Sequence, residues 1–90
     1  MKKYLIEREI PGVHQLCGAD LQGAAATSNA ALAKLSPKVQ WVQSFVTQDK
    51  TFCLYLAENE DAVREHARLS GFPANRITEV KGMIDPTTAG

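Results

Sequence analysis

The sequence has no long apolar run. Charged residues or glutamine interrupt its apolar stretches within a few residues, whereas a membrane-spanning helix needs roughly 20 apolar residues. The start Met1–Lys3 is basic, but Glu7 and Glu9 come before an apolar segment of the signal-peptide type can develop. We therefore expect no membrane partner and a cytoplasmic protein.

The sequence also lacks an excess of positive charge. Ten Lys and Arg residues balance ten Asp and Glu residues, so the formal net charge is zero. Domains that bind nucleic acid normally present a basic field to the phosphates, so we expect no nucleic-acid partner. Cysteine is scarce, and the wide spacing of Cys17 and Cys53 predicts free thiols in a reducing compartment.

Strong catalytic motifs are missing. There is no phosphate-binding loop, no Gly-x-Ser-x-Gly, no Cys-x-x-Cys and no His-Glu-x-x-His. The length of 90 residues leaves room for one small domain. We predict a single domain over residues 1–90, in which 85–90 form a C-terminal tail.

The spacing of apolar residues predicts six elements in the order βαββαβ. Runs of β-branched and aromatic residues predict strands, and apolar positions three and four apart predict helices, at 4–10, 20–35, 39–46, 51–56, 60–70 and 76–84. This order is that of the ferredoxin-like α+β sandwich, a four-stranded antiparallel sheet with two helices on one face. The other face stays open, so we expect a homodimer through the sheet face.

Several residues could carry chemistry, and each has a structural alternative. Glu7 and Glu9 project from the face of their strand opposite to Arg8, and they could chelate a cation, remain solvated charges or form salt bridges in a dimer. His66 lies on the helix face that approaches the sheet, either at a pocket or as a satisfied core histidine. Trp41 and Tyr55 could wall an apolar pocket or anchor the core.

Three strings are more specific than these patterns. They resemble the family called domain of unknown function 4242, often described as nickel-binding-protein-like, and they cover Ile6–Gly12, Glu65–Ala67 with Gly71–Arg76, and Ile84–Thr88. The resemblance implies a ferredoxin-like domain, usually paired face to face, with a nickel-binding capacity in some members.

The same resemblance indicates possible metal ligands. His66 resembles a helix histidine of metal-binding relatives, and Cys53 resembles their third-strand cysteine. Glu7 and Ser70 stand where some relatives have further histidines. Because nickel and copper prefer imidazole to carboxylate, the departures at Glu7 and Ser70 weaken the expectation of a metal site.

Three classes of function follow. The first is a small homodimeric binding protein that holds nickel, another transition metal or a small molecule between the sheet and the helix at 60–70. Its pocket would be lined by Glu7, Trp41, Cys53 and His66. The second is a cofactor-free isomerase or monooxygenase-like enzyme with His66 as general base. The third is a structural or regulatory module without a ligand. The pKa of His66 distinguishes a pocket residue from a core residue, because a nearby Glu7 would raise this pKa and apolar burial would lower it.

Overall fold

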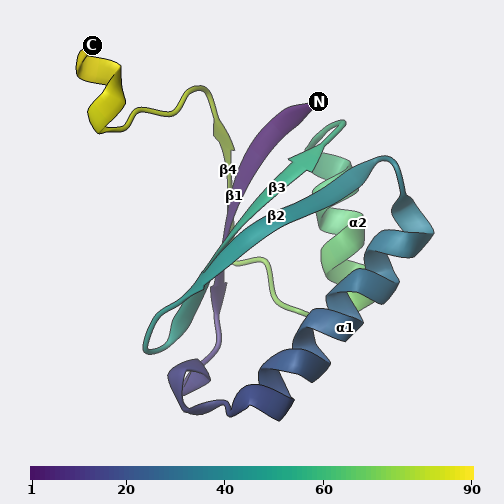
Figure 1. The fold of residues 1–90 in the computed structure, drawn as a ribbon. Helices are drawn as coiled ribbons and strands as arrows, with labels where there is room; N and C mark the ends of the chain where they lie inside the picture. The colour runs from purple at the N-terminus through teal and green to yellow at the C-terminus, as the bar shows by residue number, and fades with distance from the viewer.

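The computed structural model describes residues 1–90 and contains one sheet with two helices on one face (Figure 1). In chain order the elements are β1 (Lys2–Glu9), η1 (Val13–Gln15), α1 (Gly18–Leu35), β2 (Val39–Val46), β3 (Lys50–Ala57), α2 (Glu60–Ser70), β4 (Arg76–Val80) and η2 (Pro86–Ala89). The strands pair antiparallel in the order β2-β3-β1-β4. The predicted ferredoxin-like fold is confirmed. No helix combines the length and the apolar character needed to cross a membrane.

Strict alternation in the two interior strands divides the sheet into two faces. Tyr4, Ile6 and Arg8 of β1 are buried on the face that the helices cover, which we call the helix face. Cys53 and Tyr55 of β3 are buried on the same face. The intervening side chains point to the opposite, open face of the sheet.

Strand β2 breaks this alternation once. The register with β3 shifts between Trp41 and Gln43, because Val42 is an extra residue at a β-bulge. After the bulge Ser44 returns to the helix face, as its pairing with Cys53 requires. Trp41 and Ser44 therefore lie on the same side of the sheet, and the Trp41 indole Nε1 donates to Ser44 Oγ at 2.9 Å.

Strand β4 ends at Val80, four residues before the end that the sequence pattern predicts. Val80 pairs with Lys3, and β1 begins one residue before Lys3. Residues 82–84 therefore find no neighbouring strand, and Ile84 is 87% exposed. The short helix η2 lies beyond them, away from the sheet (Figure 1).

The core lies between the helix face of the sheet and the two helices. Seven buried residues form it: Tyr4, Ile6, Val39, Cys53, Tyr55, Ala57 and Val63. Leu32 and Leu35 of α1 pack against this cluster, as the predicted helical stripe requires.

Helix α2 has well-defined ends. The Asn59 side chain accepts the backbone N–H of Ala62 at 2.9 Å, and Glu60 and Asp61 place negative charge in the first turn. Gly71 ends the helix at a φ of 77°, a conformation that favours glycine. Both termini agree with the sequence-based prediction.

We expect Asn59→Ala to lower the free energy of unfolding by about 1 kcal/mol, because the substitution removes the helix cap. Chemical denaturation followed by circular dichroism measures this change. The matched control is Asn29→Ala at an exposed position inside α1, where alanine is the better helix former. An equal loss in both variants would contradict the capping role.

Candidate functional site

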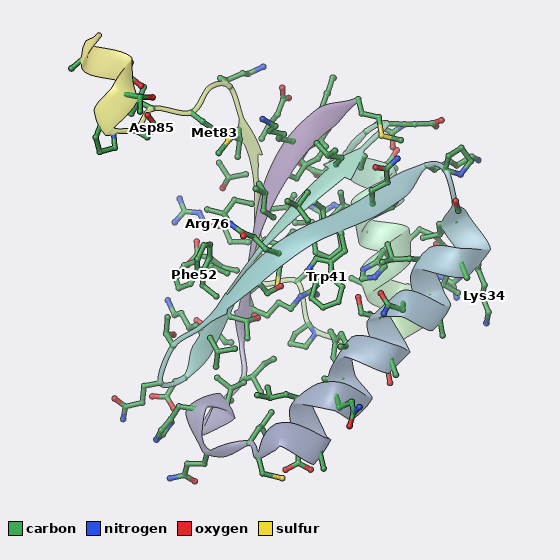
Figure 2. The ribbon with its side chains drawn as sticks, viewed as in Figure 1. Lys34, Trp41, Phe52, Arg76, Met83 and Asp85 are labelled. Carbon is green, nitrogen blue, oxygen red and sulfur yellow. The ribbon has the colours of Figure 1, made fainter.

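A cavity of about 390 Å³ lies between the helix face of the sheet and α1. Eleven of its 16 lining residues are hydrophobic. The sheet contributes Arg8, Trp41, Ser44, Val46, Thr51, Cys53 and Tyr55, and α1 contributes Leu21, Ala24, Ala25 and Ser28. Figure 2 shows Trp41 pointing from β2 into the space between the sheet and the helices. Residues Phe72 and Pro73 close one side.

The small side chains of α1 explain why this space is not filled. Leu21, Ala25 and Ser28 share one helical face, and Ala24 lies beside them. Alanine and serine project too little to reach the sheet across this distance, whereas Leu32 and Leu35 further along α1 pack onto the core. The cavity therefore lies over the first half of α1. The sequence-based prediction of a pocket beneath the helix at 60–70 is wrong on this point, because no α2 residue lines the cavity.

Arg8 is the one charged residue of the cavity wall, and it is only 2% exposed. Its Nη1 donates to the carbonyl oxygen of Pro73 at 2.7 Å. Its guanidinium carbon lies 5.9 Å from the ring centroids of both Tyr55 and Phe72, within the range of cation–π attraction. Its Nη2 has no hydrogen-bond acceptor.

His66 lies behind the cavity wall and does not line it. The side chain is fully buried, its Nε2 lies 3.2 Å from Ser28 Oγ, and its ring contacts Tyr55 edge to face at 4.9 Å. Ser28 Oγ also lies 3.4 Å from the Tyr55 hydroxyl. Ser28 therefore links a cavity-lining tyrosine to a core histidine.

The buried environment shifts two pKa values. Burial lowers the pKa of His66 below its usual 6.5, and the positive charge of Arg8 lowers it further. Burial raises the pKa of Tyr55. The His66 pKa thus moves in the direction expected for burial. The His66 Nε2 has a partner in Ser28, whereas the His66 Nδ1 is buried without one, so this core histidine is only partly satisfied. A neutral His66 and a protonated Tyr55 hydroxyl are the forms present near pH 7.

The structure separates Glu7 from the other three candidate residues. Glu7 pairs with Phe52 and Arg76 on the open face, whereas Cys53 and Trp41 lie on the helix face. The Glu7 carboxylate lies 3.7 Å from Lys50 Nζ and 4.0 Å from Arg76 Nε. The predicted pocket that joins Glu7 to His66 is therefore wrong, because adjacent positions of a strand point to opposite faces.

The proposed metal ligands do not fit a metal. Glu7 is on the other side of the sheet from His66, and the Cys53 thiol donates to Thr51 Oγ1 at 3.6 Å. No three His, Cys, Asp or Glu side chains come together anywhere in the chain. A site for nickel normally combines several such donors, so His66, Glu7 and Cys53 do not form one within a single chain.

Two residues of the site were not identified from the sequence as candidates. Arg8 follows Tyr4 and Ile6 at spacings of two, and this alternation was the signal that its guanidinium would point to the core. Ser28 belongs to the predicted stripe of α1, but nothing local indicates that its hydroxyl meets His66. Trp41 and Cys53 line this cavity, which lies over α1 and not at the predicted place beneath α2.

Comparisons with known proteins agree with the nickel-related resemblance and with the fold. A family model described as nickel responsive protein SCO4226-like matches residues 4–80. The crystal structure of SCO4226 from Streptomyces coelicolor A3(2) superposes with a TM-score of 0.76 and 19% sequence identity. The alignment covers 91% of this chain and 99% of that one, and at this identity it supports the fold alone. No curated protein matches the sequence.

We expect the free energy of unfolding to fall as the pH drops below about 6.5, because of His66. The folded state holds this imidazole neutral, so below that pH the unfolded chain binds more protons than the folded one. Urea denaturation between about pH 5 and pH 8, which spans the ordinary histidine pKa, measures the effect.

His66→Gln should flatten this pH dependence. The matched control is His14→Gln, since His14 is exposed and is the other histidine of the chain. A pH profile that follows His14 and not His66 would show that the buried histidine is not the group responsible.

Proposed function

The chain belongs to the SCO4226-like family of nickel responsive proteins, and we propose that this member binds a small, mostly apolar molecule in the cavity over α1. The observation that carries the proposal is the cavity itself, about 390 Å³ in volume with eleven hydrophobic lining residues. Ligand sites are typically concave and apolar, with a few polar groups that orient the ligand. Here Arg8, Ser28 and the Tyr55 hydroxyl supply such groups.

The size of the cavity limits the ligand. A volume of about 390 Å³ lies in the range of small-molecule sites, roughly 300–1,000 Å³. Trp41, Tyr55 and Phe72 offer aromatic surface to it. This is the size of a short-chain amphiphile or a small aromatic compound.

Nickel, which the family description mentions, is not assigned to this cavity. The cavity wall offers a single soft donor, the Cys53 thiol, and a cationic guanidinium that repels a metal ion. The residues that line this cavity therefore do not provide the donor set of a nickel site. An enzyme with His66 as base also lacks support, because His66 has no surface in the cavity.

Trp41 allows a direct test of the cavity, because it is the single tryptophan of the chain and lines the wall. We expect 1-octanol, a neutral probe of suitable size, to change the Trp41 fluorescence in a saturable titration. Ala25→Phe should abolish the change by filling the cavity. The matched control is Ala26→Phe, at the next and exposed position of α1, which should bind as the unsubstituted protein does. A response that survives Ala25→Phe would refute the cavity as the site.

We further propose that two copies associate through the open face of the sheet. This face carries Leu5, Phe45, Phe52 and Leu54, and no element of the chain covers it (Figure 1). Phe45 is 56% exposed, and Figure 2 shows Phe52 on the side of the sheet away from the helices. Contiguous apolar surface of this kind is typical of an interface between subunits.

Light scattering at micromolar concentration should give the mass of a dimer. Phe45→Glu should shift the mass to that of a monomer, because it places a charge in the apolar part of the interface. Ala26→Glu on the exposed side of α1 provides the control and should leave the dimer intact. A monomer mass for the unsubstituted protein would refute the proposed interface.

A further inference from the structure

The charge of Arg8 is not balanced by any acidic side chain. The five ion pairs of the chain involve other residues, and none of the 16 residues that line the cavity is Asp or Glu. Two backbone carbonyls and two aromatic rings surround the guanidinium. These groups carry only partial negative charge, so they solvate the cation without neutralising it.

A charged group that is 2% exposed is normally paired. Nη1 of Arg8 donates a hydrogen bond to the carbonyl oxygen of Pro73, whereas Nη2 is buried and has no hydrogen-bond acceptor. The guanidinium carries one positive charge, and the apolar cavity beside it screens charge poorly. An anion in the cavity would therefore be attracted more strongly than the same anion in water.

We infer that the ligand of this cavity is a monocarboxylate with an apolar tail, whose head group is held by Arg8. This inference rests on the proposed function and names the chemical class of the ligand. One guanidinium balances one negative charge, and carboxylate oxygens accept strong hydrogen bonds from it. Tyr55, whose ring centroid lies 5.9 Å from the Arg8 guanidinium carbon, carries a further hydroxyl donor in the same wall. The apolar remainder of the wall matches the tail.

Three ligands of equal chain length test the inference through the fluorescence of Trp41. They are octanoate, 1-octanol and octylamine, which carry a negative, a neutral and a positive head group at pH 7. We expect octanoate to bind about tenfold more tightly than 1-octanol, as one hydrogen bond between charged groups implies. Octylamine should bind most weakly, because Arg8 repels it. Equal affinity for octanoate and 1-octanol would overturn the inference and leave the apolar cavity standing.

Two variants assign the preference to Arg8. Arg8→Met keeps an apolar stem of similar length without the charge, so octanoate should no longer bind more tightly than 1-octanol in this variant. Arg8→Lys keeps the charge and should retain part of the preference. Circular dichroism establishes that each variant is folded, and the comparison of ligands on the unsubstituted protein decides the question even if Arg8→Met does not fold. If none of the three ligands changes the fluorescence, the proposed function fails together with the inference.

Discussion

The burial of one guanidinium group connects the main parts of this molecule. Arg8 sits on the interior strand β1, and its donors reach the loop that follows α2. The same loop is tied to β1 by two more bonds, from Asn75 N to the Glu7 carbonyl at 3.0 Å and from Glu9 N to Asn75 Oδ1 at 2.8 Å. The position of Phe72 and Pro73, and hence one wall of the cavity, depends on these contacts.

Local patterns in the sequence predicted most of the fold. Helix ends at Asn59 and Gly71, and the β2 span Val39–Val46, follow from neighbouring residues alone. The end of β4 depends instead on where β1 begins, which is information from the other end of the chain. The bulge at Val42 likewise depends on the pairing of β2 with β3.

The candidate site was harder to predict for the same reason. Trp41 and Cys53 were found because aromatic and thiol side chains are conspicuous, and both line the cavity. Residue type suggested that Glu7 joins His66, but the alternation of β1 puts the Glu7 side chain on the open face. Arg8, one position later, points to the helix face and lines the cavity. Alternation along β1 was therefore a better guide to the site than residue type.

The alanine-rich first half of α1 serves two opposing needs. Alanine is the best helix former, so this segment is helical without large apolar contacts. The same small side chains leave the cavity open, and unfilled apolar volume reduces stability. Leu32 and Leu35 supply the packing further along the helix. The first half of α1 thus leaves the cavity open, and the second half packs the helix onto the core.

The bulge in β2 has a consequence for the borders of the sheet. Strand β2 is one of the two outer strands, and an outer strand with regular hydrogen-bonding groups is a template for adding strands from other molecules. The extra residue Val42 interrupts that regular spacing and twists the strand locally. The other outer strand, β4, is only five residues long. Both borders are therefore poor templates for extending the sheet, which protects this small protein from open-ended aggregation.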